Sequence, residues 1–315
     1  MANSPFDHHQ LRALAAVLHA GAFAQAAVLL GVTPSAVSQR IRALEEAVGS
    51  VLIVRGTPCI GTPLGRRLAA HADEALRRDL ALAAEIGIGG DHARATVRIA
   101  VNADSLATWM LGPLAAVPDL NYDLMIDDQE FSDGLLRRGE VAAAVTAHGK
   151  AVQGCDVWAL GALRYVAVAS PGFRDSWFGN GVTARTLQHA PCLTYNARDG
   201  LQDHWMRRLT GQQLAPPRHW IPSSEGFLDA ARLGLGWGMN PVALAAPHLR
   251  TGALVELPGG VLDIALYWQA LRLMRPLLAP LTRSVRRAAG AALITPPPQP
   301  QGQAPDRSGP DTGQR

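Results

Sequence analysis

Apolar side chains recur at intervals of three and four residues between positions 8 and 48, which is the pattern of amphipathic helices. The spacing predicts three short helices, over residues 8–20, 23–30 and 34–48, and a glycine follows each of them as a typical helix stop. Residues 51–61 (VLIVRGTPCIG) change to a strand-like pattern with a turn near Gly56, which predicts a β-hairpin. Helices and hairpin in this order indicate an all-α helix-turn-helix unit with a wing.

A single long helix is predicted after the hairpin, over residues 62–86. Apolar positions line one side of it at heptad-like spacing, and such a seam needs a partner helix, so we expect two chains to pair here. The seam consists of Leu68, Ala72, Ala75, Leu82 and Ile86. The glycine-containing stretch 87–95 (GIGGDHARA) predicts a hinge-like linker.

From residue 96 the pattern changes to apolar strands that alternate with helices, which is typical of an α/β domain. A helix over about 276–293 closes the folded part, and the Pro/Gly/Gln-rich stretch 295–315 predicts a disordered tail. The predicted strands are 96–101, 122–127, 140–146, 165–170, 191–195, 219–223, 236–240 and a pair within 254–268.

Composition fits a protein of two or three domains. The chain has 315 residues, of which 48% are hydrophobic and 17% charged, as in ordinary globular proteins. The net charge of +3 is concentrated in residues 1–67, which hold six arginines and three acidic residues. A basic N-terminal unit fits a nucleic-acid partner, and the balanced remainder fits a domain that binds a small ligand.

The chain shows no sign of export or of a membrane partner. It has no apolar run of about 18 residues and no basic stretch followed by an apolar core at its start, so we expect a cytoplasmic protein. Three distant cysteines, Cys59, Cys155 and Cys192, lack metal-ligand spacing and predict neither a disulfide framework nor a metal site. A redox-sensing cysteine pair stays open as a minor alternative.

The segment LGVTPSAVSQRIRALEEAVG (30–49) carries the clearest sign of DNA recognition. Its apolar positions Val37, Ile41 and Leu44 fall on one face of the helix 34–48. The opposite face carries short polar groups and an arginine near the helix start, which is the part that enters the major groove in helix-turn-helix proteins. The predicted DNA contacts are Thr33, Ser35, Ala36, Ser38, Gln39, Arg42 and, in the wing, Arg55.

These residue types suit defined partners on a duplex. Gln39 can pair with adenine and Arg42 with guanine or a phosphate, while the helix start at Thr33 suits a phosphate oxygen. Arg55 would touch the DNA backbone and so position the protein without reading sequence. A three-helix unit with a merely solvated polar face would show the same periodicity, so periodicity alone leaves this alternative open.

The same segments carry a family resemblance. TPSAVSQRIRALEEAVGSVLIVRG resembles the recognition helix and wing of LysR-type transcriptional regulators, and TPLGRRLAAHADEAL resembles their linker helix. The likeness extends to about residue 294 and points to the lysine- and arginine-responsive LysG/ArgP branch. Its stretches are VNADSLATWMLGPL (101–114), LLRRGEVAAAVTAHGKAVQGC (135–155), LGALRYVAVASPGF (160–173), NGVTARTLQHAP (180–191) and SSEGFLDAARLGLGWGMNP (223–241).

Two departures from the branch accompany the likeness. Most of its members lack a Pro-rich tail like residues 295–315, and the match is weaker around 197–218. The resemblance still implies a complete domain plan, with an α/β effector domain of two lobes like those of periplasmic solute-binding proteins. The expected units are a winged helix-turn-helix (1–61), a linker and dimerisation helix (62–90), an effector domain (91–294; lobe one 93–165 and 266–294, lobe two 166–265) and the tail.

The effector is expected between the lobes, beyond the carboxyl ends of strands. Free N–H groups after strand 96–101 suit an α-carboxylate, and the acidic side chains, Asp127 included, suit the cationic groups of a basic amino acid. The predicted contacts are Asn102, Ala103, Asp104, Ser105, Thr108, Trp109, Asp128, Thr146, Ser224 and Glu225. Simpler roles stay open: Asp104 as a helix cap, Trp109 as a core residue and Glu225 as part of a helix start.

The resemblance implies an activator, often of a basic amino acid exporter gene, that binds double-stranded DNA and RNA polymerase as a homodimer or homotetramer without a cofactor. A periplasmic solute-binding protein would share the two lobes but needs a signal peptide and has no winged helix. An enzyme is not indicated, because the chain has no nucleophile elbow, phosphate loop or metal motif. An architectural DNA binder would lack strong sequence selectivity.

Overall fold

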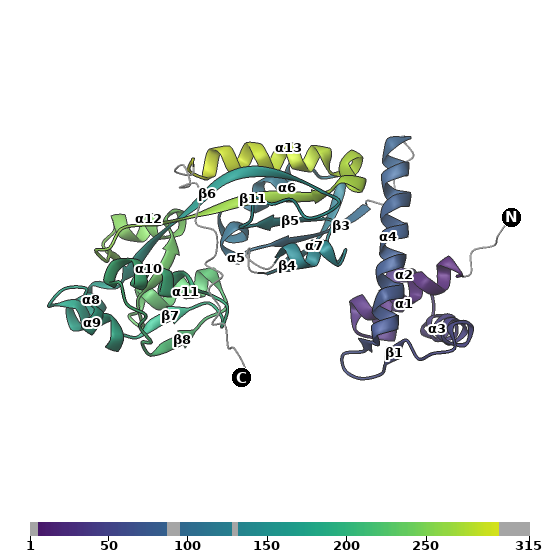
Figure 1. Ribbon diagram of the computed structural model, residues 1–315, viewed down its shortest axis with the longest axis horizontal. Coiled ribbons are helices and arrows are strands. Elements are labelled where there is room, and N and C mark those ends of the chain that lie inside the picture. The colour runs from purple at the N-terminus through teal and green to yellow at the C-terminus, as the bar shows by residue number, and fades with distance from the viewer. Residues whose placement is uncertain (1–5, 87–94, 128–131, 296–315) are drawn as a thin grey trace, which may run out of the picture.

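The computed structural model describes residues 6–86, 95–127 and 132–295. Figure 1 shows a small helical unit at one end of a long helix, and an elongated α/β unit beside that helix. Residues 87–94 of the predicted linker 87–95, Asp128, and residues 296–315 of the predicted disordered tail 295–315 lie outside the described residues. The fold class expected from the sequence is confirmed, since a helix-turn-helix unit precedes a two-lobe α/β domain built on a curled mixed sheet.

The helical unit consists of α1 (His8–Ala20), α2 (Phe23–Leu30) and α3 (Pro34–Val48). Its core joins side chains of all three helices, and Leu14, Val37 and Leu44 in it have no solvent exposure. The Asp7 carboxylate begins α1 by accepting hydrogen bonds from the N–H groups of His9 and Gln10. The local pattern therefore determined these helices, because each one buries only its apolar face.

The wing is held against α3 by one carboxylate. Strands β1 (Ile53–Val54) and β2 (Ile60–Gly61) form the predicted hairpin. Glu45 Oε1 accepts a hydrogen bond of 2.8 Å from the N–H of Leu52 and a longer one of 3.4 Å from Ile53. This contact fixes the position of the wing relative to the helix that precedes it.

The long helix α4 (Pro63–Glu85) packs on α1, and this contact covers half of the seam expected to face a partner chain. Leu68 and Ala72 are buried in the core of the helical unit. Leu82 and Ile86, in contrast, are 55% and 56% exposed. The heptad-like spacing thus combines an intramolecular contact near the start of α4 with an exposed apolar end.

One mixed sheet runs through both lobes of the α/β unit. Its strands lie in the order β10-β6-β11-β5-β3-β4, and β9 also pairs with β6. Parallel pairing joins β3 to β4 and β5, and antiparallel pairing joins β11 to β5 and β6. The bounds are β3 (Ala95–Val101), β4 (Leu120–Ile126), β5 (Ala143–Thr146), β6 (Cys155–Ala169), β9 (Gly238–Pro241), β10 (Val255–Glu256) and β11 (Leu262–Leu271).

Strands β6 and β11 are the long elements that connect the lobes (Figure 1). The sequence predicted only 165–170 as a strand here, but β6 begins at Cys155 and has 15 residues. Gly161 lies inside β6 with a φ of 135°, and the register against β11 shifts at this level. A β-carbon at Gly161 would come within 2.8 Å of the Ile294 carbonyl oxygen, so the close approach of the last folded residues requires glycine.

Helices cover the sheet in lobe one. The chain after β3 forms α5 (Ala103–Ser105), a π-helical turn (Leu106–Met110) and α6 (Leu111–Ala115), where a single helix was predicted. The helix α7 (Ser132–Arg137) contacts β5, and a 3₁₀ turn (Arg272–Met274) precedes α13 (Arg275–Ala292). The last helix packs on α6, β6 and β11 and also contacts α4, so it connects lobe one to the linker helix.

Lobe two surrounds a short parallel pair, β7 (Cys192–Thr194) and β8 (Arg218–Trp220). A β-bridge between Cys192 and Trp237 connects this pair to the segment before β9. The loop after β7 leads into α10 (Leu201–Thr210), a helix that was not predicted from the sequence. The helices of this lobe are α8 (Pro171–Phe178), α9 (Ala184–His189), α10 (Leu201–Thr210), α11 (Ser224–Arg232) and α12 (Val242–Arg250).

We expect Gly65→Ala to destabilise the helical unit, because a β-carbon there would overlap the Leu52 carbonyl oxygen of the adjoining wing segment. Overpacking of this kind costs about 1–3 kcal/mol and should lower the denaturant midpoint of that unit. Gly290→Ala is the matched control, since its added carbon meets nothing within 4 Å. An unchanged midpoint for Gly65→Ala in circular dichroism would contradict the packing described.

Candidate DNA interface and effector site

The polar face of α3 points to solvent, as DNA recognition requires. Ser35, Gln39 and Arg42 are exposed, whereas Val37 and Ile41 are buried against the preceding helices. The predicted contacts Ala36 and Ser38 are half-buried on the same helix. The helix therefore anchors through its apolar side and leaves its N-terminal polar side chains available to a groove.

The start of α3 is capped by the side chain of Thr33. The exposed Thr33 accepts a hydrogen bond from the Ala36 N–H at 3.2 Å, and its hydroxyl lies 2.9 Å from that of Ser35. Ser38 donates to the Pro34 carbonyl at 3.0 Å and so stays close to the helix. Pro34 in the first turn has no N–H to satisfy. This end of the helix suits a phosphate oxygen.

Arg55 projects from the wing toward α2. Its guanidinium carbon lies 5.4 Å from the centre of the Phe23 ring, a cation–π contact. Such a contact at an exposed site contributes about 0.5–1 kcal/mol, which favours this orientation of the side chain. The wing arginine is thereby held in position without losing its exposure.

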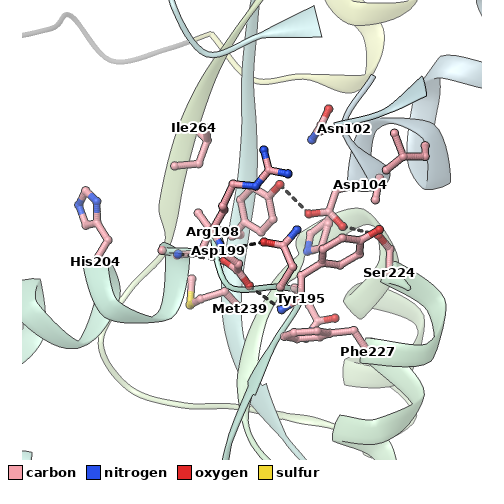
Figure 2. A pocket seen from close by; sticks show the side chains of 18 of the residues that line it. Asn102, Asp104, Tyr195, Arg198, Asp199, His204, Ser224, Phe227, Met239 and Ile264 are labelled. Carbon is pink, nitrogen blue, oxygen red and sulfur yellow. Dashed lines mark hydrogen bonds between the residues drawn. The ribbon is translucent and has the colours of Figure 1, made fainter. Parts of the chain in front are cut away.

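A cavity of about 310 Å³ lies between the two lobes (Figure 2). It opens where β3 and β4 end in lobe one, and the loop after β7 and the start of α11 close it from lobe two. The crossing strands form its wall. The lining residues are Asn102, Ala103, Asp104, Ile126, Asp127, Tyr165, Tyr195, Asn196, Arg198, Asp199, Gly200, Leu201, His204, Ser224, Phe227, Met239, Asn240, Pro241 and Ile264.

The Asp104 carboxylate connects the lobes at this cavity. One of its oxygens accepts a hydrogen bond from the Tyr165 hydroxyl on β6 at 2.8 Å, and the other accepts one from the Ser224 hydroxyl on α11 at 2.6 Å (Figure 2). Hydrogen bonds to an ionised carboxylate are stronger than those between neutral groups. Asp104 is therefore positioned by one residue of the crossing strand and one residue of lobe two.

A second carboxylate organises the loop from lobe two. Asp199 accepts hydrogen bonds from the N–H of Tyr195 at 2.8 Å and of Leu201 at 3.1 Å. Burial raises the pKa of the Tyr195 phenol, and the nearby Asp104 charge raises it further, so this ring stays protonated at neutral pH. The loop thus presents a neutral hydroxyl and a fixed backbone to the cavity.

An ion pair spans the cleft between the same loop and lobe one. Arg198 Nη1 lies 3.4 Å from Asp127 Oδ1. The Arg198 side chain is 57% exposed and that of Asp127 is 17% exposed, so the pair lies at the solvent side of the cavity. Asp127 directly follows β4, and its N–H donates to the Val101 carbonyl at the end of β3. Three carboxylates and one guanidinium therefore line the cavity within the described part of the chain.

Two family models match the chain and divide it where the fold does. The model described as "Bacterial regulatory helix-turn-helix protein, lysR family" matches residues 8–66, and "LysR substrate binding domain" matches residues 90–290. The chain belongs to the LysR family of transcriptional regulators.

Characterised relatives place the chain in the LysG/ArgP branch. The regulator LysG of Mycobacterium tuberculosis is 44% identical over 289 residues, which cover 92% of this chain and 95% of LysG. The "Lysine export transcriptional regulatory protein LysG" of Corynebacterium efficiens is 39% identical over 90% of this chain and 98% of its own. The branch that the sequence indicated is confirmed.

Solved structures of the branch have the same fold. ArgP of Mycobacterium tuberculosis, 42% identical, superposes with a TM-score of 0.75 over 94% of this chain and all of its own. Full-length LysG of Corynebacterium glutamicum with bound effector Arg, 36% identical, gives a TM-score of 0.64 over 92% of this chain and all of its own. The relatives named here are transcriptional regulators.

Four of the effector contacts predicted for this LysR-family chain line the cavity: Asn102, Ala103, Asp104 and Ser224. Asn102 is 4% exposed, and its Oδ1 has no hydrogen-bond partner among the described residues. Asp127, named as a further carboxylate, also lines the cavity. The structure thus brings the two predicted halves of the site together from opposite lobes.

Three predicted contacts on the helix after β3 do not line the cavity. The Thr108 hydroxyl donates to the Asp104 carbonyl at 2.6 Å, inside the helix. Ser105 has no exposure, and the Trp109 ring is 7% exposed within the main core. These side chains turn away from the cavity because the helix places only its first residues at the end of β3.

The remaining predictions lie elsewhere. Thr146 is buried at the end of β5. Its hydroxyl donates a hydrogen bond to the His148 carbonyl and accepts one from the Gln269 side chain on the neighbouring strand, and it does not line the cavity. Glu225 is exposed in the first turn of α11 and does not line the cavity. Asp128 lies outside the described residues.

Sequence reasoning missed the aromatic and loop residues of the site. Tyr165 belongs to a strand that was predicted but not connected to the ligand, and Arg198 and Asp199 lie in the stretch where the family match is weakest. A usable signal was present, because the run YNARDG directly follows an apolar strand. Polar loops at the ends of strands are where ligands bind in such sheets.

Neither a metal nor a membrane is indicated by the described part of the chain. No group of three or more His, Cys, Asp and Glu residues suited to a metal ion occurs there. No helix within these ranges has both the length and the apolar character to span a bilayer.

The cysteines differ in their environments. Burial raises the pKa of the Cys155 thiol to about 11, with the Asp156 charge as a second cause, and burial also raises the pKa of Cys192. Cys59 is half-buried near the wing. Thiolates are the reactive species, so the two buried thiols are protected from oxidation at neutral pH.

We therefore expect Cys59 to react first with a thiol reagent at pH 7.5, while Cys155 and Cys192 react only after unfolding. The raised pKa of the buried thiols leaves little thiolate near neutrality. Timed alkylation followed by peptide mass spectrometry measures the order. Rapid labelling of Cys155 or Cys192 in the native protein would revive the redox-sensing alternative.

Proposed function

We propose that this regulator activates the gene of a basic amino acid exporter when lysine or arginine binds between its two effector lobes. A cavity with three carboxylates and one arginine carries the proposal, because its surplus of negative charge matches a basic amino acid. The relative from Corynebacterium efficiens is named for lysine export, and that from Corynebacterium glutamicum was solved with arginine. Both relationships support the same ligand class for this chain.

Two lining groups suit the cationic parts of such a ligand. The buried Asn102 Oδ1 is an acceptor without a partner in the described structure, and an unpaired acceptor of this kind is costly unless a donor arrives. The Asp104 carboxylate accepts hydrogen bonds from Tyr165 and Ser224 at the cavity, and its charge attracts a cation. An ammonium or guanidinium group between Asn102 and Asp104 would supply N–H donors to both.

The proposed DNA contacts are residues of α3 and its N-cap, together with Arg55 of the wing. Gln39 and Arg42 would read base edges in the major groove, while Thr33, Ser35, Ala36, Ser38 and Arg55 would lie along the phosphates. Arginine is favoured for guanine because its two N–H groups match O6 and N7. The cation–π contact with Phe23 directs Arg55 before DNA binds.

Chain pairing would place two α3 helices on one pseudo-palindromic operator. The exposed Leu82 and Ile86 at the end of α4 provide an apolar contact for a second chain, and effector-domain contacts would build a tetramer. Effector binding would shift the equilibrium between two arrangements of the DNA-binding pairs and so alter contact with RNA polymerase.

Asp104→Asn should weaken arginine and lysine binding by about tenfold or more, because it removes the charge that faces the cationic groups. Calorimetric titration of the full-length protein measures the change, and thermal melting checks folding. Glu225→Gln is the matched control, since this carboxylate is exposed and does not line the cavity. Unchanged affinity in Asp104→Asn would contradict the proposal that a cationic group of the ligand lies beside Asp104.

Arg42→Ala should weaken specific operator binding by about 1–3 kcal/mol. The exposed guanidinium on α3 would lose a contact to guanine or phosphate without disturbing the buried face. A gel-shift titration on the promoter fragment measures the loss. Arg232→Ala, in an exposed pair with Asp229 on α11, is the control and should bind like the wild type. Equal affinities for both variants would exclude Arg42 from the interface.

A further inference from the structure

Arg198 is the one guanidinium among the residues that line the described cavity. It rises from the loop beside Asp199 toward the side of the cavity where Ile264 and Asn102 lie (Figure 2). Its Nη1 lies 3.4 Å from Asp127 Oδ1 of lobe one. The side chain therefore extends from lobe two into the space between the lobes.

The backbone that carries Arg198 is fixed, whereas its side chain is not enclosed. The Asn196 side-chain oxygen accepts a hydrogen bond from the Arg198 N–H at 2.8 Å. Asp199 binds the N–H groups of Tyr195 and Leu201 on either side of it. The guanidinium itself is 57% exposed. The backbone of this residue is thus fixed, and its exposed guanidinium is accessible to a ligand in the cavity.

Net charge alone would favour the wrong ligand. Among the described lining residues, three carboxylates and one guanidinium sum to a formal charge of minus two. A decarboxylated basic amino acid, such as agmatine or cadaverine, carries two positive charges, while arginine or lysine carries one in net terms. Coulombic attraction therefore favours the amine over the amino acid unless a residue of the site binds the α-carboxylate.

We propose that Arg198 is the specificity-determining residue that binds the α-carboxylate of the effector and so selects basic amino acids over their decarboxylated amines. The inference rests on the proposed function, because it assigns a contact within the same site. Arginine suits this role since its planar fork of N–H donors matches a carboxylate. A guanidinium has five such donors, so one that faces Asp127 can also hold a ligand carboxylate.

The two ends of the ligand would then contact different lobes. Asn102 and Asp104 in lobe one face the cationic groups, and Arg198 in lobe two faces the carboxylate. A zwitterionic ligand bridges the cleft, whereas an amine without a carboxylate contacts lobe one and leaves Arg198 to Asp127. Arg198 would thus determine both which ligand is preferred and whether the ligand contacts both lobes.

The test compares arginine with agmatine, and lysine with cadaverine, by calorimetric titration of the full-length protein. The wild type should bind arginine at least about tenfold more tightly than agmatine, which corresponds to one charge-assisted contact. In Arg198→Ala, arginine affinity should fall about tenfold while agmatine affinity stays or rises, so that the preference disappears. Arg198→Lys keeps the charge without the fork and should show an intermediate preference.

Arg174→Ala is the matched control, because Arg174 pairs with Asp175 on α8 and does not line the cavity. It should keep the wild-type preference. A merely structural role of Arg198 would lower both affinities by the same factor, and that result would overturn the inference. So would an unchanged preference in Arg198→Ala, or a wild type that binds agmatine as tightly as arginine. A wild type that binds none of the four ligands would refute the proposed function itself.

Discussion

The hydrogen bonds of the Asp104 carboxylate are the interaction on which the effector site depends. This group follows β3 in lobe one, yet its donors are Tyr165 on the crossing strand and Ser224 in lobe two. A carboxylate in a narrow cleft needs such donors, because burial without them is costly. The contacts that satisfy it also hold the two lobes in register. Any ligand cation that approaches Asp104 therefore acts on the same group that connects the lobes.

The distance from this cavity to the DNA-reading helix is covered by packed elements. Strands β6 and β11 run through both lobes, and α13 packs on them and on α4. Arg77 of α4 donates to the Gly139 carbonyl of lobe one at 2.8 Å, and Asp73 of α4 lies 3.2 Å from His19 of α1. These contacts form a continuous packed connection from the cavity through lobe one and α4 to the helical unit. The exposed end of α4 lies beyond these contacts.

The sequence predicted the features that depend on local pattern. The helix 34–48 and its polar face follow from the spacing of Val37, Ile41 and Leu44, and Asn102 to Asp104 follow from their position after an apolar strand. Tyr165 and Arg198 could not be placed in the same way, because they meet Asp104 and Asp127 through contacts 61 and 71 residues apart along the chain. Thr146 also ends a strand, but its hydroxyl accepts a hydrogen bond from the Gln269 side chain of the neighbouring strand, and it does not line the cavity. Strand ends identify a region, and tertiary packing decides which side chains face the ligand.

The opposed charges of the cavity give selectivity and signalling a common physical cause. Coulombic interactions strengthen as water leaves a cleft. The attraction between a ligand charge and an opposite charge of the protein would therefore be strongest with the lobes closed around the ligand. A ligand that satisfies Asp104 from one side and Arg198 from the other gains more from closure than one that satisfies a single side. Only a ligand with different affinities for the open and closed arrangements can shift their balance. With the contacts proposed above, a dicationic amine would leave Arg198 paired with Asp127 and so would lack the contact to lobe two that a zwitterionic ligand makes.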